Sequence, residues 1–218
     1  MVHIVGLCGF IGTGKSTVAD LLDYKQLSFA EKIKDTCSVL FDWPRDMLEG
    51  SSPESRKWRE TPDIFWSKIR GDDFTPRLAL QLFGTESVRN VIHQDFWIET
   101  VRKRILSSEE NIVITDCRFP NEVKLIQEMG GHIFWVQRGD TPEWFDAAMK
   151  SVCTINLTKE DPMVHFPHVH KSEYSWLGAN FTDHIDNNGT LKELRLEIDR
   201  KIKGRYHNDN SKQKELIQ

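Results

Sequence analysis

The sequence is poor in cysteine and lacks both a long apolar run and an excess of positive charge. Its four cysteines form no Cys-x-x-Cys pair, and two of them lie in predicted strands or strand ends, which favours reduced buried thiols over disulfides. No stretch approaches the roughly 18 apolar residues that a membrane span needs. The formal net charge of -4 argues against a surface that coats nucleic acid. We therefore expect neither a membrane nor a nucleic acid as partner.

Other signals are absent as well. There is no internal repeat, and the apolar start of the chain is broken by Gly6 and Gly9 and has no basic leader, so it predicts a strand and not a signal peptide. Together with reduced thiols, this predicts a cytoplasmic protein. The content of 39% hydrophobic and 28% charged residues is typical of a globular chain, and 218 residues suffice for one large domain with insertions.

Residues 9–16 carry the strongest motif, Gly-x-x-x-x-Gly-Lys-Ser. It lies between an apolar run (residues 4–7) and a helical pattern (residues 16–22), so a strand delivers a glycine-rich loop to a helix start whose free N–H groups attract phosphate. Lys15 can reach the β- and γ-phosphates of a nucleotide, and the Ser16 hydroxyl can coordinate Mg²⁺. The candidate residues for ATP binding here are Gly12, Thr13, Gly14, Lys15, Ser16 and Thr17.

Three charged residues follow predicted strands at the sheet edge where ligands bind in open α/β folds. Asp116 ends a β-branched run (residues 111–115), where it can hold Mg²⁺ or simply cap a helix. Arg118 follows two residues later and could lie over the same cleft. Arg138 emerges from the predicted strand 132–136 and is a candidate phosphate clamp. Lys15, Arg118 and Arg138 are the candidate catalytic residues.

Further candidates could hold a second substrate. Lys34 near the start of a predicted helix (residues 30–41) faces an anion or is a solvated charge. Arg77 and Gln81 lie one turn apart on a helix that Thr75 caps, so they could hold a phosphate and a base edge, or form a salt-bridged surface pair. Trp97, in a predicted helix at residues 95–106, is either a stacking surface or a core residue.

Two irregular segments interrupt the pattern of alternating strands and helices. The first is a basic, aromatic insertion with several glycines and prolines, and an acceptor-binding insertion would cover about residues 42–108. The second, a lid at about residues 139–174, begins with a predicted helix at 141–149. It contains His165, His168 and His170, which suggest a metal site, although no cysteine or carboxylate completes a familiar ligand set. A polar tail follows at 207–218.

Five strand candidates alternate with helices, which predicts a three-layer α/β fold of the P-loop NTPase type with a five-stranded parallel sheet, as a single domain over residues 1–206. Several motifs then occur in a fixed order along the chain. They are the loop at 9–16, Thr75-Pro76-Arg77 with Gln81, Phe83-Gly84-Thr85-Glu86, Thr115-Asp116-Cys117-Arg118-Phe119-Pro120-Asn121-Glu122, His170-Lys171-Ser172-Glu173 and Asn187-Asn188-Gly189-Thr190.

This ordered set resembles the bacteriophage deoxynucleoside monophosphate kinase family, over nearly the whole chain to about residue 203. The resemblance implies a nucleoside-monophosphate-kinase-like fold, Mg²⁺-ATP as donor, a deoxynucleoside monophosphate (dNMP) as acceptor and, for a viral protein, the host cytoplasm as location. On that interpretation Asn188 and Gly189 border the donor adenine, Ser16 and Asp116 hold the metal, and the acceptor contacts are Lys34, Arg77, Gln81, Trp97 and Arg118.

Two other functions stay open at this point. One is another small-molecule P-loop kinase, such as one resembling dephospho-coenzyme A kinase, which shares the loop and the late Asn-Gly turn. The other is a nucleotide-binding switch without catalysis, although a guanine-reading Asn-Lys-x-Asp is absent. Monomer and homodimer are both compatible with the sequence.

Overall fold

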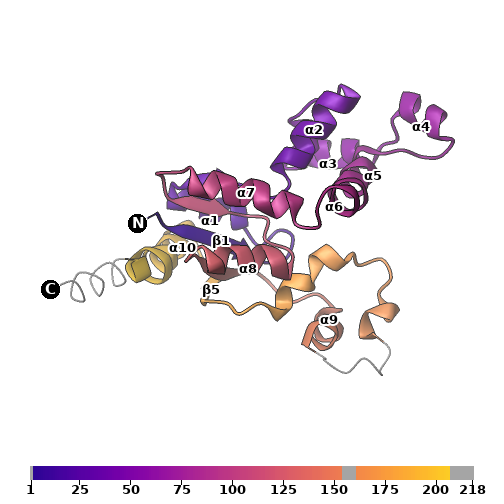
Figure 1. Ribbon diagram of the computed structural model, residues 1–218. Coiled ribbons are helices and arrows are strands. Elements are labelled where there is room, and N and C mark those ends of the chain that lie inside the picture. Colours follow the sequence, from indigo (N-terminus) through magenta and orange to yellow (C-terminus); the bar gives the residue numbers. More distant parts are fainter. Residues whose placement is uncertain (1, 154–160, 207–218) are drawn as a thin grey trace. The chain divides into compact units, whose positions relative to one another are not determined.

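The computed structural model describes residues 2–153 and 161–206. Part of the predicted lid (154–160) and the predicted tail (207–218) lie outside these residues. The chain divides into two compact units, one made of Met1–Leu27 with Ile105–Gln218 and the other of Ser28–Arg104 (Figure 1). Each unit is described by itself.

The first unit is built on a five-stranded parallel sheet with the strand order β2-β3-β1-β4-β5. The strands are β1 (Ile4–Cys8), β2 (Lys25–Leu27), β3 (Ile112–Ile114), β4 (His132–Gln137) and β5 (Asp183–Asp186). Val5 of β1 pairs with Val113 on one side and His132 on the other, so β1 is the central strand. The predicted five-stranded parallel α/β fold is confirmed.

Helices cover both faces of this sheet. Successive residues of β1 face opposite sides of it, so they pack against different helices. Val5 and Leu7 pack into a core that also contains residues of α1 (Lys15–Leu22) and α10 (Leu191–Ile198). Gly6 points to the opposite face, where a Cβ would lie 2.7 Å from a methyl group of Ile126 in α8 (Pro120–Glu128). The result is three layers, with α8 on one side and α1 with α10 on the other.

Short helical segments complete the first unit. They are α9 (Phe145–Cys153), the 3₁₀ turns η3 (Pro162–His165), η4 (Lys171–Glu173) and η5 (Ser175–Gly178), and a π-helical turn, η6 (Asp199–Lys203), that extends α10. In the part of the chain that the structure describes, no helix is both long enough and apolar enough to cross a membrane.

The second unit is helical. Its elements are α2 (Glu31–Phe41), η1 (Met47–Glu49), α3 (Pro53–Glu60), α4 (Ile64–Arg70), α5 (Pro76–Gln81), the π-helix η2 (Leu82–Ser87), α6 (Val88–Val91) and most of α7 (Phe96–Leu106). Trp43 and Phe74 lie in its core. The Asp63 carboxylate accepts hydrogen bonds from Trp43 Nε1 (2.8 Å) and from the backbone N–H of Trp66 (3.0 Å). It therefore caps α4 and also holds the side chain of Trp43 in place.

Some predicted element bounds were wrong. The segment 42–73, expected to be irregular, contains the helices α3 and α4. Its helix-breaking residues stand at helix ends: Ser52 caps α3, Pro53 follows at the first helical position and Gly71 ends α4. The helix expected from residue 141 begins at Phe145, since residues 141–144 form only a turn closed by the bond from Phe145 N–H to Pro142 O.

Candidate active site

The phosphate loop leaves the central strand and enters α1 with the backbone that its glycines permit. Gly12 and Gly14 have φ of 84° and 91°, in the left-handed region that favours glycine, and Gly14 is the residue before the helix. No side chain caps α1 and its first turn contains no acidic residue. The helix start therefore offers free N–H groups and a positive dipole end to an anion.

Lys15 lies over this loop. Its ammonium group donates hydrogen bonds to the carbonyl oxygens of Gly9 (2.8 Å) and Phe10 (2.9 Å). Burial, and after it the positive charge of Arg118, lower the pKa of Lys15 from 10.5 to about 8, while Glu173 acts in the opposite direction. A cation held in so poorly solvated a place would gain strongly from a phosphate that lies beside it.

The neighbouring strands hold the loop in place. A Cβ on Gly9 would lie 2.5 Å from the carbonyl oxygen of Val136 in β4, so glycine is needed for this close approach. The buried Asn187, which follows β5, donates from its side-chain amide to Thr13 O (2.8 Å). Thr13 is itself buried and its hydroxyl donates to Phe10 O (3.0 Å). The loop is therefore fixed before any ligand arrives.

Asp116 and Arg118 follow β3, as the sequence predicted. The turn that carries them is held by the buried Glu122, whose carboxylate accepts from the backbone N–H groups of Arg118 (2.7 Å) and Phe119 (3.0 Å). Arg118 extends its side chain to Glu173, with 3.2 Å between Nη1 and Oε1. Its backbone is thus anchored on one side and its guanidinium on the other.

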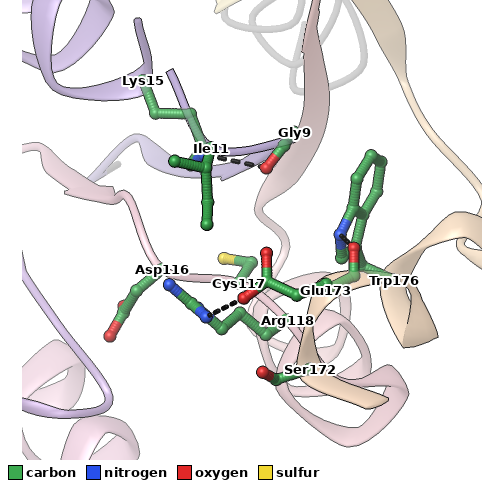
Figure 2. A pocket seen from close by; sticks show the side chains of 9 residues that line it. All are labelled: Gly9, Ile11, Lys15, Asp116, Cys117, Arg118, Ser172, Glu173 and Trp176. Atoms are coloured by element: carbon green, nitrogen blue, oxygen red, sulfur yellow. Dashed lines mark hydrogen bonds and ion pairs between the residues drawn. The ribbon is translucent and has the colours of Figure 1, made fainter. Parts of the chain in front are cut away.

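These groups surround one pocket. Figure 2 shows Lys15 on one side of it and the pair of Arg118 and Glu173 on the other. The pocket is lined by Gly9, Ile11, Lys15, Asp116, Cys117, Arg118, Ser172, Glu173 and Trp176. The structure therefore brings together three residues selected from the sequence, namely Lys15, Asp116 and Arg118, although more than 100 positions separate the first from the others.

Arg138, Asn188 and Gly189 lie near one another at the ends of β4 and β5. The backbone N–H of Gly139 donates to Asn188 Oδ1 (2.7 Å), which ties the residue after Arg138 to the Asn-Gly turn. Asn188 also donates to Asp186 (2.7 Å). Arg138 is exposed and has no ion-pair partner among residues 2–153 and 161–206.

The remaining candidates lie in the helical unit. Lys34 pairs with Glu49 (2.6 Å), and Arg77 on α5 pairs with Glu60. Gln81 is exposed on the same helix as Arg77. Trp97 is only 5% exposed, which is the position of a core residue, and its use as a stacking surface stays a prediction.

Sequence reasoning did not single out Glu173 and Trp176 for the pocket, and it did not predict that Asn187 holds the phosphate loop. The first lies in the motif His170-Lys171-Ser172-Glu173 and the last in Asn187-Asn188-Gly189-Thr190, so the ordered motifs were the available signal. For Trp176, whose ring packs on Phe10 of the loop, no pattern in the sequence pointed to the site.

Comparison with known proteins adds an independent line of argument. Residues 46–150 match the family model described as deoxynucleotide monophosphate kinase. A protein of Acanthamoeba polyphaga mimivirus, provisionally named a deoxynucleotide monophosphate kinase, is 29% identical over 153 residues, which cover 62% of this chain and 74% of the relative. The deoxynucleoside-5'-monophosphate kinase of Escherichia phage T5 is 28% identical, and the matched region covers 59% of this chain and 73% of the phage protein.

Similar solved structures include two small-molecule kinases. A dephospho-CoA kinase from Campylobacter jejuni has a TM-score of 0.44 at 14% identity, covering 96% of this chain and 100% of that one. A shikimate kinase from Aquifex aeolicus has a TM-score of 0.43 at 15% identity, covering 93% and 98%. Structural similarity with TM-scores and identities this low supports no conclusion about substrates.

Proposed function

We propose that this chain is a member of the deoxynucleotide monophosphate kinase family and that it transfers the γ-phosphoryl group of ATP to a dNMP, giving ADP and dNDP, at the pocket around Lys15. One observation supports placing this reaction at the pocket. Lys15 of the phosphate loop and Arg118 of the turn after β3 line the same pocket, and the family match, which includes Arg118, does not include the loop. Two independent signals therefore converge on one place.

The donor phosphates would lie over the start of α1. Its free N–H groups and Lys15 supply positive charge there, and the fixed loop needs no reorganisation as charge moves toward the leaving oxygen. Lys15 would exchange its two carbonyl partners for phosphate oxygens. Asn188 and Gly189, in the turn tied to Gly139, are proposed to border the adenine.

Ser16 and Asp116 are proposed to hold Mg²⁺. A hydroxyl and a carboxylate are the hard oxygen donors that this ion accepts, and Mg²⁺ usually takes only one or two protein carboxylates, with phosphate and water completing its shell. When bound, the ion would neutralise charge on the donor phosphates.

Arg118 and Arg138 are proposed to stabilise the negative charge on the group in transfer. Phosphoryl transfer demands little covalent chemistry of the protein, so positioning and charge account for most of the catalysis. A guanidinium can meet two phosphate oxygens at once, which an ammonium cannot. No general base is required, because the acceptor phosphate is already ionised near neutral pH.

The acceptor is proposed to bind through residues of the helical unit. Lys34, Arg77, Gln81 and Trp97 all belong to the unit Ser28–Arg104. The segment at about 139–174, proposed as a lid, supplies Ser172 and Glu173 to the Lys15 pocket, which supports a role in covering it. Four free cysteines suit a reducing compartment, so we also propose the cytoplasm as the place of action.

A coupled assay of ADP release tests this function. The purified protein is given Mg²⁺-ATP with dAMP, dCMP, dGMP, dTMP or a modified pyrimidine monophosphate, and with the ribose counterparts. We expect ADP and a dNDP in equal amounts from at least one deoxynucleotide. Tight ATP binding without ADP release on any of these acceptors would contradict the proposal and favour a binding-only role.

A further inference from the structure

The turn formed by η4 and η5 touches the phosphate site at two points. Glu173 reaches Arg118 with 3.2 Å between Oε1 and Nη1, and the Trp176 ring meets the Phe10 ring edge-on, with 5.1 Å between centroids. The two contacts are coupled, because Trp176 Nε1 donates to the carbonyl oxygen of Glu173 (2.8 Å). One short segment therefore contacts both the phosphate loop and Arg118.

This turn is held firmly. The Ser175 hydroxyl donates to Lys171 O (2.8 Å), the backbone N–H of Glu173 donates to His170 O (2.9 Å), and Trp176 is only 2% exposed. Arg118 is equally fixed at its backbone by Glu122 (2.7 Å). Since both partners are anchored by other contacts, the ion pair between Glu173 and Arg118 is built into the fold.

The carboxylate of Glu173 pairs with the guanidinium of Arg118, a group that could also bind a phosphate oxygen. Carboxylate and phosphate are the two anions that a guanidinium binds with matching geometry, so they compete for the same donors. We propose that Glu173 is a positioning residue of the kinase reaction, an internal anion that keeps Arg118 directed into the pocket beside Lys15 and is displaced by substrate phosphate. This rests on the proposed function of the pocket.

Removing the Glu173 carboxylate should therefore have opposite effects on nucleotide binding and on turnover. Without its partner, Arg118 is available to phosphate at once, and one negative charge is gone from the pocket, so nucleotide phosphate binds more tightly. Arg118 is also no longer held in its productive orientation beside Lys15, so phosphoryl transfer slows. A residue with a purely structural role would weaken binding and turnover together.

The experiment uses Glu173→Gln in the full chain, with Glu110→Gln as the matched control. Glu110 also pairs with a basic residue, Lys25 at 2.9 Å, and belongs to the same unit, so the control removes the same charge from an exposed ion pair away from the pocket. Binding of AMP-PNP and of a dNMP that the wild type uses is measured by calorimetry, and kcat by ADP release. Thermal unfolding verifies that both variants fold.

We expect Glu173→Gln to bind AMP-PNP, the dNMP or both about two- to fivefold more tightly, the range of a partly exposed ion pair, and to have a kcat about tenfold lower. Glu110→Gln should match the wild type. In an Arg118→Ala background the Glu173→Gln change should no longer tighten binding. Glu173→Asp, with a shorter carboxylate, should lie between the wild type and Glu173→Gln.

Equal or weaker binding of both ligands by Glu173→Gln, or tightening that persists without Arg118, would overturn the assignment. Those results are distinct from a failure of the proposed function. In that case the wild type itself would release no ADP on any dNMP, whereas the calorimetric comparison of variants would still report whether Glu173 competes with phosphate.

Discussion

The side-chain amide of Asn187 donates a 2.8 Å hydrogen bond to the backbone carbonyl of Thr13, so the residue after the last strand holds the phosphate loop near the other end of the chain. Asn187 is 8% exposed and Thr13 is 3% exposed, so water cannot replace this bond easily. The two residues are 174 positions apart. The loop geometry therefore depends on the completed sheet. Loop substitutions that disturb the contact between Asn187 and Thr13 should destabilise the protein more than those that do not.

Replacing Gly14 by alanine should destabilise the protein more than replacing Gly12. Both glycines have positive φ, which costs an alanine about 1 kcal/mol or more, but only a Cβ at Gly14 would lie 2.2 Å from Asn187 Nδ2. At Gly12 nothing lies within 4 Å. We expect an additional loss of about 1 to 3 kcal/mol for Gly14→Ala, measured as free energies of unfolding in urea. Equal losses would mean that the loop relaxes away from Asn187.

Lys15→Ala should abolish most phosphoryl transfer and leave the fold intact. Among the described residues, the Lys15 ammonium donates hydrogen bonds to two carbonyls of its own loop and to no distant group. Removal of one charge-stabilising donor costs on the order of 10²- to 10³-fold in kcat. Lys25→Ala, which removes an exposed lysine of the same unit, is the control. Wild-type turnover by a folded Lys15→Ala protein would exclude the proposed mechanism.

Arg77→Ala should impair use of the acceptor while the KM for ATP stays unchanged. The Arg77 side chain is 45% exposed and pairs with Glu60, so its loss should change stability by less than about 1 kcal/mol. We expect the KM for the dNMP to rise roughly tenfold or more, as for a lost charged hydrogen bond to phosphate. Glu60→Gln breaks the same ion pair but keeps the guanidinium, so it should retain dNMP use. An unchanged dNMP dependence in Arg77→Ala would show that the acceptor contacts were assigned wrongly.

Alkylation at pH 8.5 should distinguish the cysteines. Cys153 is exposed and should react, whereas Cys37 is buried and its burial raises its thiol pKa from 9.0 to about 11, so little reactive thiolate is present. Iodoacetamide treatment followed by peptide mass spectrometry measures this, and in denaturant both sites should be modified. Rapid labelling of Cys37 in the folded protein would contradict its buried position.

The raised pKa of the Cys37 thiol should also make the free energy of unfolding depend on pH. Between pH 9 and pH 11 the Cys37 thiol is already deprotonated in the unfolded chain but keeps its proton in the folded one. The unfolded state then binds fewer protons, so the free energy of unfolding should fall as pH rises through this window. The slope should be less steep in Cys37→Ser, because Cys37 no longer contributes to it.

Local features were predictable because their determinants are close in sequence. The phosphate loop between strand and helix depends on glycine φ angles and on helix-end N–H groups, and both are encoded within residues 9–16. The caps at Thr75 and Thr190 were equally visible, since each side chain accepts from a backbone N–H three residues later. The number of strands followed from apolar runs of strand length.

By itself, then, the sequence determined the phosphate loop, the parallel α/β class and the resemblance to a kinase family. Only the tertiary structure decided the strand order β2-β3-β1-β4-β5, the hold of Asn187 on Thr13, and the arrival of Glu173 and Trp176 at the pocket of Lys15. Those features depend on which strands pair and which side chains pack across the sheet. Such choices are made between residues far apart in the chain, where no local period or spacing records them.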